Sequence, residues 1–233
     1  VDPREAGRTV AADASRVEPD ARRCRQAPPR SAVALQHTAL TERAQRALSL
    51  EANRLLGGDA VLRADAPIQS ALRAAAQRPG LRSSDSRGFR SMVGVGDEVK
   101  LGEIRAVSDG FPLRGRFVIE RRAGQGEVAR GIPARGSVWM SSAGATALAA
   151  KVGDSVSVGD ASLRLDAIVT EEPEAALDVF SAGPKVFLNL ADLPGTALEQ
   201  PGSRITYRLA VAGEPDAVEA FEKEARANLG RGQ

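Results

Sequence analysis

Apolar residues recur at helical or alternating spacing from about residue 41 to the end of the chain. A helical stripe begins near Thr41 and ends at Gly57-Gly58, a pair that supplies a helix stop. A strand over residues 60–63 follows, and Pro67 then suits the first turn of a second helix, which Pro79-Gly80 ends. The helical positions are Ala44, Leu48, Ala52, Leu55, Leu56, Ile68, Ala71, Leu72 and Ala75. This order of helix, strand and helix indicates the opening of an α/β layer.

The middle of the chain predicts strands joined by tight turns. Residues 81–107 are expected to form two strands that turn at Gly96-Asp97, with a bulge at Gly102 where the apolar alternation breaks. From Gly136 to about Glu174 the pattern predicts a strand, a short helix and a β-hairpin, and this hairpin turns at Gly159-Asp160. The other expected elements are a strand at 117–119, a polar loop over 124–131, a strand at 186–190, a turn at 191–194, a strand at 204–211 and a helix over 215–229.

Together these elements predict an α+β fold. We expect a split α/β lobe, in which helices cover a mixed sheet, with a small β-rich module nested inside it. The expected boundaries are a tail over 1–40, a first part of the lobe over 41–135, the inserted module over 136–183 and a second part of the lobe over 184–233. The tail is rich in Arg, Ala, Pro and Asp and shows no periodicity, which is typical of a disordered segment.

Composition restricts the function classes. Aromatic residues make up 3% of the chain, so the core must rest on Leu, Val, Ile and Ala, which favours a packed scaffold over an aromatic-lined ligand cleft. The sequence pI is about 9.0, yet the positive surplus lies in residues 1–40, and 41–233 carry equal numbers of acidic and basic residues. With few aromatic residues to stack on bases, nucleic-acid binding is not expected.

Cysteine content and hydropathy add two exclusions. Cys24 is the only cysteine, so an intramolecular disulfide and a cysteine-rich metal site are excluded. No run approaches the about 20 apolar residues that span a bilayer, and the first ten residues lack the apolar middle region of a secretion signal. From the sequence alone, no route out of the cytoplasm is visible.

Two short motifs suggest catalytic chemistry. Gly153-Asp154-Ser155-Val156 is similar to the serine block of GDSL-type hydrolases, but such a serine needs a histidine base, and the only histidine is His37 in the tail. The entry turn of a strand is the favoured interpretation. Gly94 to Lys100 has the glycines and lysine of a phosphate loop, but a strand pattern follows where a nucleotide loop leads into a helix, so a turn is favoured.

Other polar groups have ordinary structural explanations. Glu171, Glu172 and Glu174 lie at a strand exit without a nearby histidine, which indicates a solvated junction rather than a metal site. Ser181 and Lys185 have the residue types of a catalytic dyad, but Gly183-Pro184 between them predicts a loop that leads into a strand. We therefore assign no catalytic, cofactor-binding or metal-binding residues from the sequence.

Large apolar residues offer one interaction candidate. Trp139 and Phe187 lie on expected strands and are predicted to belong to the core. The Val179-Phe180 step in the loop from Asp178 to Gly183 is either a partner contact or, as we favour, a small satellite core.

Several blocks, in chain order, resemble the extracytoplasmic core of FtsX-like ABC transporter permeases, the MacB-type periplasmic core. Within that family the chain most resembles the large multi-span permeases associated with lipid or lipoprotein handling. The resemblance covers roughly residues 41–229, and its blocks lie at 55–62, 106–115, 136–139, 152–154, 184–194 and 201–209.

The resemblance implies a non-enzymatic part of an exporter. A cytoplasmic ABC ATPase would be the partner, and this domain would lie on the periplasmic side of the inner membrane, where it moves or docks a lipid, a lipoprotein or a partner protein. No cofactor is implied. Flexible joints are expected near Arg135-Gly136 and Ala182-Gly183, since motion between stiff bodies needs a few hinges.

The chain departs from the family in two ways. The transmembrane helix that relatives carry before the helix near Thr41 is missing, and a second span is missing after Gln233, so a permease fragment is expected. In that case two alternatives remain for residues 1–40. They are either a genuine tail or the result of a truncation or a misread frame. Two other classes stay open, namely a free-standing binding module of the same fold and an ester hydrolase built around Ser155.

Overall fold

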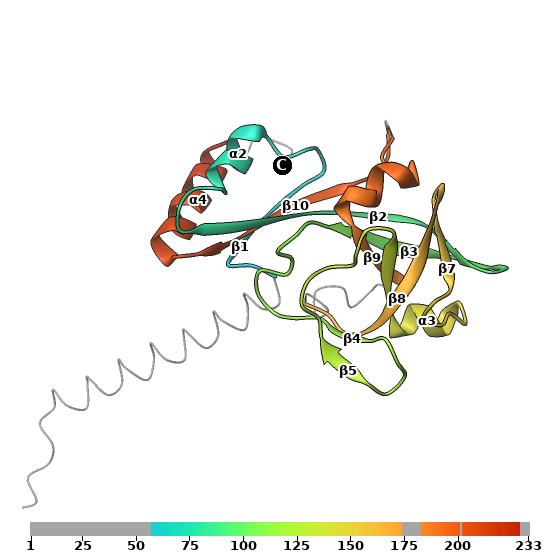
Figure 1. Cartoon of the computed structure of the whole chain (residues 1–233). Coiled ribbons are helices and arrows are strands. Elements are labelled where there is room, and N and C mark those ends of the chain that lie inside the picture. The colour runs from blue at the N-terminus through green and yellow to red at the C-terminus, as the bar shows by residue number, and fades with distance from the viewer. Residues whose placement is uncertain (1–56, 174–182, 201, 229–233) are drawn as a thin grey trace, which may run out of the picture. The chain divides into compact units, whose positions relative to one another are not determined.

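The computed structural model describes residues 57–173, 183–200 and 202–228 (Figure 1). All of them belong to the larger of two compact units, residues 44–233. The expected tail over 1–40, the helix that begins near Thr41 and the Val179-Phe180 loop lie outside the described residues.

The strands of the described residues form one mixed sheet of ten strands, in the order β1–β10–β2–β3–β9–β6–β8–β4–β5, and β7 pairs with both β2 and β8. The α+β class with a mixed sheet is thereby confirmed. The strands are β1 (Ala60–Ala64), β2 (Leu81–Val95), β3 (Glu98–Val107), β4 (Val118–Glu120), β5 (Gly126–Val128), β6 (Ser137–Ser141), β7 (Ser155–Val158), β8 (Ala161–Glu171), β9 (Lys185–Asn189) and β10 (Thr206–Gly213).

Part of the sheet closes into a small barrel. β2, β3, β9, β6, β8 and β7 form a ring in which each strand pairs with the next, and β7 completes the ring by pairing with β2. The β3–β9 and β6–β8 pairs are parallel and the other pairs are antiparallel. The interior is filled by buried aliphatic side chains, as small barrels require. These are Val93, Ile104, Val138, Met140, Val156, Val158, Leu163, Leu165, Val186 and Leu188.

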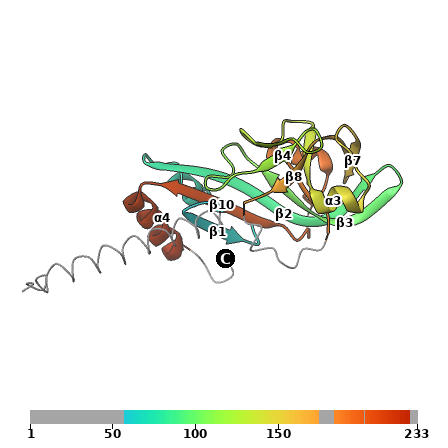
Figure 2. The same cartoon turned by 90° about the horizontal axis from the view of Figure 1, so that it is seen from below.

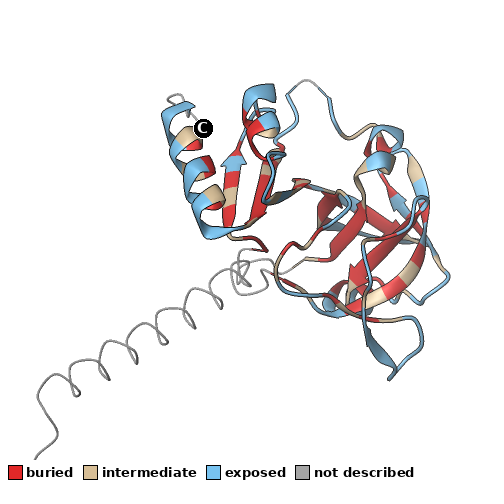
Figure 3. Cartoon of the chain, turned by 60° about the vertical axis from the view of Figure 1, so that its left-hand side comes forward, coloured by how far each residue is buried: buried red, intermediate tan, exposed pale blue. Residues whose placement is uncertain are grey.

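Beyond the barrel the sheet continues as a flat extension. β2 pairs with β10 over residues 81–88 and with β7 over 93–95, so this one strand belongs to both regions. The helices α2 (Ser70–Ala75) and α4 (Pro215–Asn228) pack on one another, and α4 packs on β1 and β10 (Figure 2). Helix α4 buries Val218, Phe221 and Ala225 and turns its other side to solvent, which is the amphipathic pattern expected from the sequence (Figure 3).

The opposite face of the sheet carries a second core. Phe117 contacts Trp139 and Phe187 edge to face, with ring centroids 5.5 and 5.0 Å apart, and Phe111 lies 5.9 Å from Phe117. Ile119 of β4 packs in the same cluster. Five of the eight residues that form this cluster lie on strands or loops outside the predicted module.

The local elements follow the sequence with several differences. The bulge expected at Gly102 is absent, because β2 and β3 pair in regular register on both sides of that residue. A short exposed strand, β5, lies in the expected polar loop, β8 runs on to Glu171, and the expected turn at 191–194 is a 3-10 helix, η2 (Leu190–Thr196). The short helix expected at Ala143–Ala150 is α3 (Ser142–Ala147), which is two residues shorter and is capped by Ser141. The boundaries at 135/136 and 183/184 stay predictions, and strands from both sides of each boundary share the barrel.

Candidate functional site

The Ser155 block enters a strand, as favoured from the sequence. Ser155 opens β7, and its Oγ lies 2.5 Å from the hydroxyl of Ser162 on the neighbouring strand β8. Gly153 N donates to Leu165 O, and Leu165 N donates to Asp154 O, each at 2.8 Å, so the block is held as the entry to a ladder. A serine hydroxyl is no general base, and His37 lies outside the described residues.

The glycine-rich segment from Gly94 to Lys100 is the turn of the β2–β3 hairpin. Val95 pairs with Glu98, Gly96 has φ +58°, and β3 follows without a helix. Lys100 Nζ lies 3.8 Å from Glu98 on the surface. The segment therefore lacks the helix N-terminus that a nucleotide loop uses, and the interpretation as a turn is confirmed.

The acidic cluster at the end of β8 is ion-paired. Glu172 Oε1 lies 2.7 Å from Lys185 Nζ, and both side chains are largely buried. Glu171 lies 3.3 Å from Arg116 on the surface. In the part of the chain that the structure describes, no group of three His, Cys, Asp or Glu residues is arranged to hold a metal ion. Glu174 and Ser181 lie outside that part, so the Ser181–Lys185 dyad has no structural test.

Trp139 and Phe187 are core residues, as predicted. Both are almost fully buried in the aromatic cluster. Sequence reasoning missed the pairing of these two residues on β6 and β9 and the placement of Phe117 over them. No local pattern signals this arrangement, because the residues lie far apart in the chain.

The ion pair of Asp59 and Arg114, which we call a clamp, joins two of the blocks that resemble permeases. The sequence did not reveal it. Asp59 accepts hydrogen bonds from Arg114 Nε at 2.8 Å and from Arg114 Nη2 at 2.6 Å, and it also accepts one from Gly213 N at 3.1 Å. The hydrogen bond to Asp59 raises the pKa of Arg114 above its ordinary value, although partial burial acts in the opposite direction. The clamp ties the start of β1 to the loop before β4 and to the end of β10.

A second clamp holds one of the predicted joints. Gly136 N donates to Asp192 Oδ2 at 2.7 Å, and Arg135 Nε lies 3.5 Å from the other oxygen of Asp192. At the other joint Gly183 packs on β3 so closely that an added Cβ would lie 2.7 Å from Leu101 O. Among the described residues, both joints therefore contact strands of the barrel or the 3-10 helix beside it.

Comparison with known proteins gives a function class. The chain is 31% identical over 184 residues, 79% of its length, to the uncharacterized ABC transporter permease YbbP of Escherichia coli strain K12. The chain is a relative of the ABC transporter permeases. It spans 22% of the length of that permease. The resemblance to these permeases expected from the sequence is thereby confirmed, and no family model matches the chain.

Two solved structures have a loosely similar arrangement, each with a TM-score below 0.5. The periplasmic region of MacB from Actinobacillus actinomycetemcomitans aligns over 72% of this chain and 81% of its own, with a TM-score of 0.44 and 9% identity. The extracellular domain of the noncanonic ABC-type transporter YknZ from Gram-positive bacteria aligns over 66% of this chain and 76% of its own, with a TM-score of 0.45 and 10% identity. In the described part of this chain, none of the helices has the length and apolar character of a membrane span.

Proposed function

We propose that this chain is the extracytoplasmic domain of an ABC transporter permease. In this proposal it is non-catalytic and couples ATP-driven motion of the membrane spans to the export or extraction of a lipid, a lipoprotein or a similar substrate. A cytoplasmic ABC ATPase is the partner, and the domain lies on the periplasmic side of the inner membrane. The match to an ABC transporter permease over most of the chain is the observation that carries the proposal.

The architecture supports a mechanical role. β2 and β3 pair along their whole shared length, and β2 runs from the helix-covered extension into the barrel. The Asp59–Arg114 clamp and the buried Glu172–Lys185 pair add ties between segments that are distant in sequence. A body built in this way transmits a displacement from one end to the other, which a domain driven by membrane spans must do.

The same contacts bear on the two joints expected from the sequence. Gly136 is hydrogen-bonded to Asp192, and Gly183 packs on the backbone of Leu101. These contacts favour movement of the domain as one body over bending at the joints. Limited trypsin digestion tests this, because a flexible joint exposes the bond after Arg135 to early cleavage, whereas a clamped joint leaves that bond no more sensitive than other exposed arginine sites.

The flanking DNA provides the first test of the transporter role. The proposal expects that resequencing and translation of every frame will show apolar runs of about 20 residues just before Thr41 and just after Gln233, with an ATPase gene nearby. The full-length permease and that ATPase, reconstituted in vesicles, should then release lipid or lipoprotein in an ATP-dependent manner. Deletion of this domain should abolish release while basal ATP hydrolysis persists. Flanks without membrane spans would refute the transporter role and leave a free-standing binding module.

A further inference from the structure

A broad hollow on the β1–β10–β2 extension of the sheet has four arginines among its lining residues. Its volume is about 590 Å³, and Arg63, Arg90, Arg204 and Arg208 contribute to its lining, with Glu103 as an acidic neighbour. Hollows of this size accommodate small molecules or the polar head of a larger one. The arginines come from β1, from β2, from β10 and from the loop that precedes β10.

Strand register places most of these side chains on one face. Arg63 of β1 pairs with Arg208 of β10, and Thr206 of β10 pairs with Gly88 of β2. Arg90 lies two residues beyond Gly88 and therefore projects from the same side of the sheet. Directly paired side chains lie about 5 Å apart and diagonal ones about 7–8 Å apart, so long arginine side chains from these positions can reach one bound group.

The charge at this surface is only partly balanced by the protein. Among the described residues, Arg63, Arg90 and Arg204 form no ion pair, and all three are exposed. Arg208 and Glu103 each make an interaction of their own.

The space over Gly88, which we call the floor of the hollow, is open and lies next to the arginines. Gly88 lies in the interior of a strand, and its pairing with Thr206 on one side and Arg105 on the other is in regular register, without a bulge. A Cβ added at Gly88 would meet no atom within 4 Å. A glycine in a strand interior that serves no bulge often marks a place where a ligand approaches the backbone.

From this arrangement we infer that the hollow binds a phosphate group, as a phosphate monoester or diester. Arginine suits this role because its planar guanidinium donates two parallel hydrogen bonds to phosphate oxygens. Thr206 lines the hollow beside the arginines, and the open space over Gly88 leaves room for the bound group. The site follows from the sheet geometry and does not depend on the transporter role, so its failure would leave the proposed function standing.

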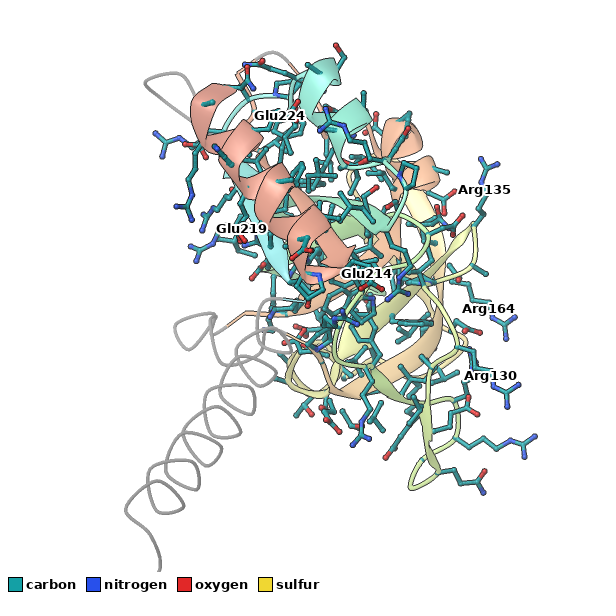
Figure 4. The ribbon with its side chains drawn as sticks, turned by 90° about the vertical axis from the view of Figure 1, so that its left-hand side faces the viewer. Arg130, Arg135, Arg164, Glu214, Glu219 and Glu224 are labelled. Carbon is teal, nitrogen blue, oxygen red and sulfur yellow. The ribbon has the colours of Figure 1, made fainter. Side chains whose placement is uncertain are left out.

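The test measures binding of the full chain to three probes. These are inorganic phosphate, vesicles of phosphatidylglycerol mixed with phosphatidylcholine, and vesicles of phosphatidylcholine alone. The variant Arg63→Gln/Arg204→Gln should weaken binding about tenfold, because two charge-assisted contacts are lost. Gly88→Val should weaken binding by filling the floor, and it should leave the thermal midpoint unchanged because the Cβ enters open space. Arg130→Gln/Arg164→Gln, at two exposed arginines that do not line the hollow (Figure 4), removes an equal charge elsewhere and should bind as the parent does.

The outcomes separate the sources of the phosphate. Binding of inorganic phosphate and of phosphatidylglycerol vesicles, both lost in the double arginine variant, means that the phosphate group suffices. Binding of vesicles alone, with the same loss, identifies a lipid headgroup. The inference is overturned if no probe binds, if Arg63→Gln/Arg204→Gln binds as the parent does, or if Arg130→Gln/Arg164→Gln weakens binding as much as Arg63→Gln/Arg204→Gln.

Discussion

Two glycines with the same backbone conformation allow a matched test of how the β7–β8 hairpin docks. Gly96 turns the β2–β3 hairpin with φ +58°, and Gly159 turns the β7–β8 hairpin with φ +57°. A Cβ at Gly96 would meet nothing within 4 Å. A Cβ at Gly159 would overlap the backbone oxygen of Thr196 and come within 2.8 Å of Leu198 Cγ. Alanine substitutions at the two positions therefore have the same cost in backbone conformation. They differ in the contact that the new Cβ makes with Thr196 and Leu198.

The magnitudes follow from these surroundings. An L-residue in the left-handed region costs about 1–2 kcal/mol, and the reduced freedom of the unfolded chain returns about 0.4–1 kcal/mol, so Gly96→Ala should destabilise by about 1 kcal/mol. Overpacking adds about 1–3 kcal/mol at Gly159. Thr196 cannot move away easily, because its carbonyl accepts Asp160 N at 2.9 Å and its side chain is fully buried. Gly159→Ala should therefore cost about 2–4 kcal/mol.

Urea unfolding measures both variants. Trp139 is the only tryptophan and is buried in the aromatic cluster, so its fluorescence reports unfolding of the barrel region without an added probe. The slope of the free energy of unfolding against urea should stay unchanged in both variants, which would attribute the difference to the native state. Equal destabilisation by the two substitutions, within about 0.5 kcal/mol, would refute the docking of the hairpin on the 3-10 helix.

Three further predictions concern single contacts. Tyr207 donates a hydrogen bond to Glu199 at 3.1 Å, so Tyr207→Phe should destabilise the domain by about 1 kcal/mol. Burial first, and then this hydrogen bond, raise the pKa of Tyr207 above 10.0. The stabilisation by Tyr207 is therefore full below about pH 10 and is lost as the pH rises through the higher pKa of the folded state. The urea midpoint should accordingly fall less between pH 8 and pH 11 in Tyr207→Phe than in the parent. Trp139 Nε1 is buried without a hydrogen-bond partner, so Trp139→Phe should cost less than the about 3–5 kcal/mol expected for Trp139→Ala in thermal unfolding. A double-mutant cycle of Asp59→Ala and Arg114→Ala should give a coupling energy of about 1 kcal/mol, and additive effects would contradict the clamp.

Local signals explain why most elements are predictable from the sequence. The Gly96-Asp97 and Gly159-Asp160 turns lie between alternating segments, and the structure has hairpins at both. The stripe of α4 is equally local, since Val218, Phe221 and Ala225 recur at helical spacing and are buried together.

Closure of the barrel is not predictable in this way. It depends on the parallel pairing of β3 with β9 and of β6 with β8, and residues 103 and 185 of the first pair are distant in the chain. The apolar pattern of a strand is the same whether the neighbouring strand is parallel or antiparallel. The β5 strand was missed for another reason, because Gly126–Val128 is fully exposed and carries no buried stripe.

Charge counting also misses the arginine hollow. Residues 41–233 contain equal numbers of acidic and basic residues, which led to the expectation that no basic face exists. The sheet nevertheless gathers Arg63, Arg90, Arg204 and Arg208 around one hollow, while acidic residues such as Glu219 lie on the helix α4 (Figure 4). A sum of charges along the chain does not show that the order of the strands separates basic from acidic residues in space.

The blocks that carry the resemblance to permeases meet in space as structural contacts. Asp59, from the first block, clamps Arg114, from the second, and Gly136 of the third donates to Asp192 of the fifth. Contacts of this kind fix the fold, so a chain can share them with other permeases and still handle a different substrate. Arg63 and Arg90 lie outside the blocks, on a face that the clamps leave open. Binding of phosphate by this chain should therefore respond to substitutions at those two arginines, whereas substitutions in the clamps should alter stability first.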